Sequence, residues 1–232
     1  MTSKIMKKLD AAVDRNKFYA VADAIKVLKG LSAERKFNQS MEIAVVTGLD
    51  TKHADQQLRI MIELPHGTGK ARRVGVFAKD AKAAEALAAG ADVVGSDDLA
   101  DKVMKGEINF DVCIATPDMM GLVGKLGKVL GPKGMMPNPK LGTVTMDVKK
   151  AIGAAKGGAV EVRAEKAGIV QAGLGKFSFT EAQLTENLKA FMAAINRSKP
   201  TGAKGVYIKK VVLSSSMGPG IKIDLASLSE AA

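Results

Sequence analysis

Apolar residues in the first thirty positions recur at helical spacing, which predicts two helices. The residues that carry this pattern are Ile5, Leu9, Ala12, Val13, Val21, Ile25 and Leu28. Gly30 is predicted to end the second helix. Apolar and polar residues then alternate over residues 41–47 and 58–64, which predicts two half-buried strands. Helices followed by alternating strands are typical of an α+β domain.

A different pattern begins at residue 67. Strands are predicted at residues 73–78, 91–94 and 111–116, and helices at residues 80–89 and 97–105. Ser96 is predicted to cap the second of these helices, and a longer helix is predicted to begin after Thr116, with Pro117 at its first position. Because the strands are short apolar runs that alternate with helices, they predict a parallel, Rossmann-like sheet covered on both faces.

The first pattern returns after the KGG sequence at residues 156–158. Strands are predicted at residues 159–164, 168–173, 206–214 and 220–225, and a helix at residues 181–196, with Thr180 and Gln183 as its capping box. This tail is similar in style to the start of the chain. We therefore expect two domains of mixed α/β and α+β class. A discontinuous α+β domain, residues 1–66 and 159–232, is interrupted by an inserted Rossmann-like α/β domain, residues 67–158.

Glycines lie at both crossings between these predicted domains. They are Gly67, Gly69, Gly157 and Gly158. A short linker that contains glycine absorbs backbone rotation at low cost, so these positions suit a two-stranded hinge. Ordinary tight turns explain them equally well on sequence alone.

The chain of 232 residues carries 35 Lys and Arg against 24 Asp and Glu, a net charge of +11. Such an excess favours a polyanionic partner, either nucleic acid or an anionic membrane surface. Residues 119–146 and 187–223 contain no acidic residue at all. The first stretch contains four lysines that are candidates for a surface that faces RNA: Lys125, Lys128, Lys133 and Lys140. No strongly amphipathic Lys-rich helix supports membrane binding.

Other features of the sequence predict a soluble cytoplasmic protein. It has no apolar segment long enough for a membrane span or a signal peptide. The single cysteine, Cys113, needs no oxidising compartment, and its place in an apolar strand favours a buried structural thiol.

Catalytic and cofactor motifs receive little support. The sequence GTGK at residues 67–70 lacks the first glycine and the Ser/Thr of a phosphate loop, and a strand follows it where a helix is needed. His53 and His66 have no carboxylate or cysteine at a metal-ligand spacing. We therefore expect no enzyme activity, no cofactor and no metal. A rival hypothesis is a nucleotide-binding or enzymatic α/β protein, but residues 78–81 (AKDA) have no glycine where its phosphate loop would lie.

Three segments of the discontinuous domain have chemistry suited to RNA: residues 35–40 (RKFNQS), 175–179 (GKFSF) and 214–220 (SSSMGPG). They combine cations, aromatic rings, hydroxyl and amide groups and glycine, which serve shape recognition, 2′-hydroxyl contacts and stacking. In the first segment Asn38, Gln39 and Ser40 are all candidates to bond RNA. Core packing of the phenylalanines and a simple turn at residues 214–220 explain the same residues equally well.

These segments also carry a family resemblance. The most specific stretches are residues 64–70 (LPHGTGK), 115–123 (ATPDMMGLV), 124–144 (GKLGKVLGPKGMMPNPKLGTV), 175–179 (GKFSF) and 215–220 (SSMGPG). Over essentially its full length the chain resembles the bacterial members of the ribosomal protein L-one family of the large subunit. The resemblance implies a discontinuous RNA-binding domain joined through a hinge to the inserted domain.

The implied partners are the large-subunit rRNA of the mobile stalk, deacylated tRNA at the exit site, other ribosomal components and the protein's own operon mRNA, whose translation it would repress. The family's RNA-contacting motifs fall on Lys36, Phe37, Ser40, Lys176, Ser178, Ser216, Met217 and Gly218. Residues 39–40 read Gln-Ser where the family usually has Glu-Thr, and Ser216 replaces the usual Thr. Residues 168–173 (GIVQAG) lack the family's common histidine, which puts a contact there in doubt.

Overall fold

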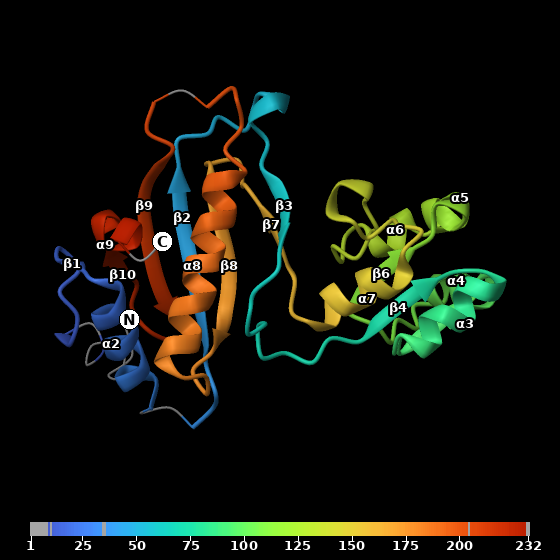
Figure 1. The fold of residues 1–232 in the computed structure, drawn as a ribbon, viewed down its shortest axis with the longest axis horizontal. Coiled ribbons are helices and arrows are strands. Elements are labelled where there is room, and N and C mark those ends of the chain that lie inside the picture. The colour runs from blue at the N-terminus through green and yellow to red at the C-terminus, as the bar shows by residue number, and fades with distance from the viewer. Residues whose placement is uncertain (1–8, 10, 34–35, 204, 231–232) are drawn as a thin grey trace. The chain divides into compact units, whose positions relative to one another are not determined.

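The structure is a computed structural model in which residues 9, 11–33, 36–203 and 205–230 are described (Figure 1). The chain divides into two compact units, Met1–Gly69 with Val160–Ala232, and Lys70–Ala159. We call them the discontinuous unit and the inserted unit. Most of the first predicted helix, including Ile5, lies outside the described residues.

A five-stranded sheet forms the centre of the discontinuous unit. Its strands in spatial order are β1 (Phe18–Tyr19), β10 (Ile221–Ile223), β9 (Ile208–Ser215), β2 (Ser40–Thr47) and β8 (Ile169–Lys176). Only the β1–β10 pair is parallel, and every other neighbouring pair is antiparallel. A separate antiparallel pair joins β3 (Arg59–Ile62) to β7 (Val160–Arg163).

Two helices, α2 (Val21–Ala33) and α8 (Glu181–Arg197), cover one face of this sheet (Figure 1). Alternate side chains of β2 are buried beneath them, as the period of two predicts. The fully buried residues of the helices that meet this face include Ala24, Ile25, Leu28, Leu184, Leu188, Phe191 and Ile195. These contacts form one hydrophobic core for the discontinuous unit.

The inserted unit contains a parallel sheet in the order β5 (Val93–Gly95), β4 (Val74–Phe77) and β6 (Val112–Ala115). Successive side chains of β4 and β6 enter two separate apolar clusters, so both faces of the sheet are covered, as predicted. Helices α3 (Asp80–Ala88) and α7 (Val148–Lys156) pack on one face. Helices α4 (Asp97–Met104), α5 (Met120–Lys125) and α6 (Gly127–Leu130) pack on the other.

Several local predictions were wrong. Gly30 does not end α2, which continues to Ala33, because Leu31 and Ser32 still pack into the core and outweigh the low helix propensity of glycine. The long helix after Thr116 is instead a 3₁₀ turn, η2 (Pro117–Met119), followed by the short helices α5 and α6. This segment carries three glycines within seven residues, and each costs a helix about 1 kcal/mol relative to alanine.

The predicted cap of α4 was also wrong, because the Ser96 side chain makes no capping hydrogen bond.

Other elements were not predicted. They are α7, α9 (Leu225–Glu230), β1, η1 (Ala54–Gln56) and η3 (Pro139–Leu141). All of them except the nine-residue helix α7 are too short for an apolar pattern to stand out.

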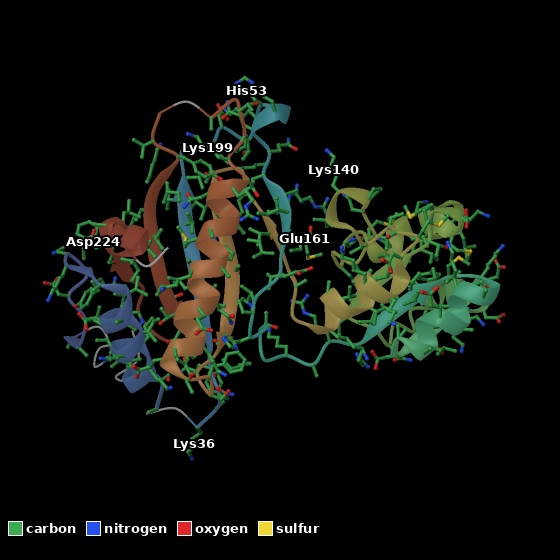
Figure 2. The ribbon with its side chains drawn as sticks, viewed as in Figure 1. Lys36, His53, Lys140, Glu161, Lys199 and Asp224 are labelled. Atoms are coloured by element: carbon green, nitrogen blue, oxygen red, sulfur yellow. The ribbon has the colours of Figure 1, made fainter. Side chains whose placement is uncertain are left out.

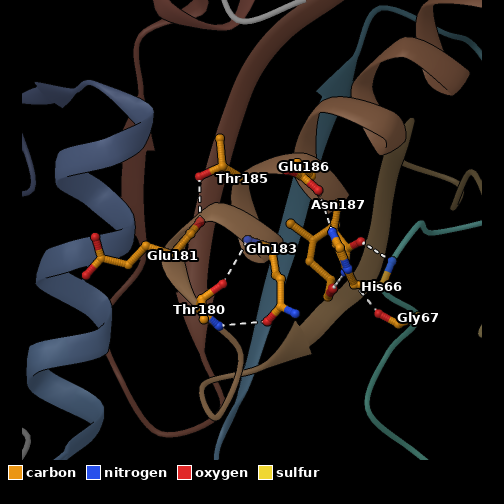
Figure 3. A network of polar contacts seen from close by, with 9 residues as sticks. His66, Gly67, Thr180, Glu181, Gln183, Thr185, Glu186 and Asn187 are labelled. Carbon is orange, nitrogen blue, oxygen red and sulfur yellow. Dashed lines mark hydrogen bonds and ion pairs between the residues drawn. The ribbon is translucent and has the colours of Figure 1, made fainter.

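The N-terminus of α8 has the predicted capping box. The Thr180 hydroxyl accepts a hydrogen bond from the Gln183 backbone N–H, and the Gln183 side chain accepts one from the Thr180 N–H (Figure 3). Two backbone donors that the helix leaves unpaired are thereby satisfied.

Replacing Thr180 with Ala should destabilise the discontinuous unit by about 1 kcal/mol, because the helix loses this cap. Urea unfolding followed by circular dichroism measures the loss. Thr185→Ala is the matched control, since its hydroxyl bonds only the Glu181 carbonyl one turn earlier in the same helix. Equal effects of the two substitutions would contradict a role for the cap.

Candidate nucleic-acid interface

The three segments with RNA-binding chemistry meet at one end of the five-stranded sheet. The strand β2 is antiparallel to both of its neighbours, so its first residues lie beside the last residues of β8 and β9. Ser40 pairs with Lys176, and Met41 pairs with Gly175 on one side and Ser215 on the other. Figure 2 shows Lys36 at this same end of the sheet.

The predicted RNA-contacting residues are all on these segments, the first of which is separated from the other two by more than a hundred positions in the sequence. We call the following set the sheet-end surface: Lys36, Phe37, Ser40, Lys176, Ser178, Ser216, Met217 and Gly218. The topology of the sheet therefore gathers every one of them into a single surface.

Hydrogen bonds tie the three segments together. The Ser40 N–H donates to Ser216 Oγ (3.1 Å), and the Ser216 N–H donates back to the Ser40 carbonyl (3.2 Å). On the other side, Asn38 Nδ2 donates to Ser178 Oγ (3.1 Å), and Lys176 Nζ lies 3.4 Å from the Asn38 carbonyl oxygen. These bonds orient hydroxyl and ammonium groups on a common backbone frame.

The side chain of Gln39 points into this frame, and only 2% of the residue is exposed. Its Oε1 accepts from the Met217 N–H (3.0 Å), and its backbone carbonyl accepts from the Phe177 N–H (3.0 Å). The expectation that Gln39 bonds RNA was therefore wrong. The inward direction of Gln39 could have been predicted from the sequence, because the alternation that buries Met41 and Ile43 extends back to residue 39.

The phenylalanines of these segments differ in their exposure. Phe37 is 51% exposed and is free to stack on a base, whereas Phe177 is buried and Phe179 packs against the core. Met217 is 50% exposed and gives the surface a second apolar group.

Glycine is required where the backbone of this surface folds closely on other groups. A side chain at Gly218 would collide with the Ser215 hydroxyl. A Cβ at Gly175 would lie 3.0 Å from the Phe179 ring and 3.1 Å from Leu184. The chemistry of the surface thus consists of two ammonium groups, three hydroxyls, one aromatic ring and one thioether around a closely packed backbone.

The candidate basic stretch lies in the inserted unit. Lys125 ends α5, Lys128 lies in α6, Lys133 lies in the turn after α6, and Lys140 lies in η3. All four residues are exposed, and within the described part of the chain none of them forms an ion pair. Their positive charges are therefore available to an anionic partner.

The glycines at the crossings are not equivalent. Gly67, Gly69 and Gly158 have left-handed φ angles of 64°, 69° and 94°, which favour glycine. Gly157 has a φ of −66° and ends α7, so its backbone conformation does not require glycine.

His66 lies beside a carboxylate that is distant in the sequence. Its Nε2 contacts the carboxylate of Glu186 on α8 (Figure 3). Among the described residues no group of three or more metal-binding side chains occurs.

Burial raises the pKa of Cys113 to about 12, so its thiol stays protonated at neutral pH. None of the helices in the described ranges is both long and apolar enough to cross a membrane.

Cations, hydroxyls, an exposed ring and glycine at the end of a sheet are typical of a surface that binds RNA. The chain belongs to the ribosomal protein L1p/L10e family, which it matches over residues 28–219. The match includes every residue of the sheet-end surface. The protein is thus a ribosomal protein of the large subunit, and the family resemblance of the sequence is confirmed.

Replacing Gln39 with Leu should lower the free energy of unfolding by about 1–3 kcal/mol, because the Met217 N–H loses its acceptor beside the core. Ser216→Ala is the comparison, since its hydroxyl bonds Ser40 in an exposed position and its loss should cost about half as much or less. Chemical denaturation of both variants checks the ranking. A larger loss for Ser216→Ala would show that Gln39 does not hold the surface together.

Proposed function

We propose that the sheet-end surface binds the rRNA of the mobile stalk of the large ribosomal subunit. The observation that carries this proposal is the convergence of three distant segments, each with RNA-binding chemistry, at the junction of β8, β2 and β9. Membership of a ribosomal protein family supports it, because that role requires contact with rRNA.

In this proposal some residues of the surface raise the affinity for RNA, and others select which RNA is bound. The ammonium groups of Lys36 and Lys176 neutralise phosphates, which raises affinity and the rate of association. Phe37 stacks on a base, and the hydroxyls of Ser40 and Ser216 bond phosphate or 2′-hydroxyl groups. The backbone around Gly218 approaches the RNA closely because no side chain intervenes.

We further propose that the inserted unit contacts deacylated tRNA at the exit site and assists its release. The exposed, unpaired lysines of residues 125–140 support this assignment, since they form a cationic stretch with no acidic neighbour in the sequence. In this proposal the two units are domains, with Gly67–Gly69 and Gly157–Gly158 as the hinge between them.

The same RNA-binding surface would repress translation of the protein's own operon, by binding a stalk-like structure in its mRNA. Binding, positioning and competition between rRNA and mRNA need no catalytic step and no cofactor. The proposed setting is cytoplasmic, among the other components of the large subunit.

Met217→Asp should weaken binding of an rRNA stalk transcript by about 100-fold or more, because it places a carboxylate against phosphate. Met217→Leu keeps an apolar side chain of similar volume and should bind nearly as well as the wild type. Filter binding measures both dissociation constants, and circular dichroism confirms the fold. If Met217→Asp bound as tightly as the wild type, the site assignment would fail.

Replacing the inserted unit by a short linker from Gly69 to Val160 should leave stalk RNA affinity within a few-fold of the wild type, since every residue of the sheet-end surface is retained. The isolated inserted unit is the complementary sample in the same binding assay. If it carried the affinity instead, the proposed domain roles would be reversed.

A further inference from the structure

Asn187, in the middle of α8, is a fully buried polar residue. Its Oδ1 accepts from the His66 N–H (3.0 Å), and its Nδ2 donates to the carbonyl oxygens of Gly67 (2.9 Å) and Leu174 (2.8 Å). Figure 3 shows the amide between the helix and the turn that carries His66 and Gly67. One side chain thus satisfies backbone groups of two segments that are more than a hundred residues apart.

One of these partners, Leu174, lies at an irregularity in the sheet. Glu42 pairs with Gly173 and Met41 pairs with Gly175, so Leu174 is an extra residue with no partner on β2. This is a β-bulge, which leaves a residue unpaired and changes the direction of the strand after it. The Leu174 carbonyl at this bulge accepts a hydrogen bond from Asn187 Nδ2.

The bulge lies immediately before the part of β8 that enters the sheet-end surface. Lys176 is two residues beyond Leu174, and Ser178 follows after another two. Their direction therefore depends on the geometry of the bulge.

The turn on the other side of Asn187 supports the same residues. A Cβ at Gly69 would lie 3.0 Å from Lys176 Cγ and 3.2 Å from the Phe179 ring, so the turn packs closely on this stretch of β8. The contact between His66 and Glu186 attaches the turn to α8 a second time, beside Asn187.

We propose that Asn187 is a positioning residue for RNA binding. It does not touch RNA. It holds the bulge at Leu174 and the turn at His66–Gly67, and thereby sets the directions in which Lys176 and Ser178 present their polar groups. This inference rests on the proposed function of the sheet-end surface.

Asparagine is the residue type that this position requires. It offers one acceptor and two N–H donors on a short side chain, and all three groups are used. Leucine would leave three buried backbone groups without a partner, and aspartate would place an acceptor against two carbonyl oxygens.

The test compares Asn187→Asp with Asn196→Asp in the full chain. Asn196 is an exposed residue of the same helix, so its substitution makes the same change in charge at a site without these contacts. We expect Asn187→Asp to weaken binding of an rRNA stalk transcript about tenfold, as the loss of one well-oriented contact would. Asn196→Asp should bind within about twofold of the wild type.

A double-mutant cycle separates positioning from a general loss of structure. In a Lys176→Ala background, where one of the positioned groups is already gone, Asn187→Asp should weaken binding by clearly less than tenfold. Full additivity with both Lys176→Ala and Ser178→Ala, or unchanged affinity of the folded Asn187→Asp variant, would overturn the proposal.

If the wild type itself fails to bind stalk RNA, the proposed function is wrong. Amide hydrogen exchange of the RNA-free protein then tests whether Asn187 still positions the bulge and the turn. Asn187→Asp should then still speed exchange at residues 66–67 and 174–178 more than at residues 208–213. Unchanged exchange at residues 174–178 would overturn the positioning role as well. Asn187→Ser, which leaves room for a bridging water, gives the same two readouts if the aspartate variant does not fold.

Discussion

The pairing of β2 between β8 and β9 is the constraint on which the rest of the discontinuous unit depends. It buries alternate residues of β2 beneath α2 and α8, and it also sets the start of β2 beside the ends of both neighbours. A slip of one residue would turn the core face of β2 outward and separate Ser40 from Ser216. The register that the hydrophobic core requires is therefore the register that assembles the sheet-end surface.

The net charge of +11 explains less of the selectivity than its size suggests. Only two ammonium groups belong to the sheet-end surface, while the four exposed lysines of residues 125–140 belong to the other unit. Charge raises affinity for any polyanion, so it does not choose between RNAs. In the proposed function this choice rests on Phe37, on the hydroxyls and on Met217. Hydrogen bonds between the segments hold the backbone of this surface in place.

The sequence predicted what local patterns determine. The capping box of α8, the alternating strands and the apolar parallel strands all depend on neighbours within a few residues. The sequence also indicated which segments form the candidate surface, because each segment contains residue types that suit RNA binding. It did not predict the inward direction of Gln39, the bulge at Leu174 or the contacts of Asn187. Each of these involves at least one contact between segments more than a hundred residues apart.

Three buried polar side chains of the discontinuous unit lie beside departures from regular pairing in its main sheet. Thr47, beside the register shift at the far end of β2, donates to the Gly168 carbonyl, and Gln39 and Asn187 act at the near end. Each bonds a backbone group in an irregular part of the chain, which helps to keep that backbone stable inside the core. Two of these three residues lie beneath the sheet-end surface. The irregular backbone at the sheet-end surface is stable because the core beneath it contains two amides that complete its hydrogen bonds.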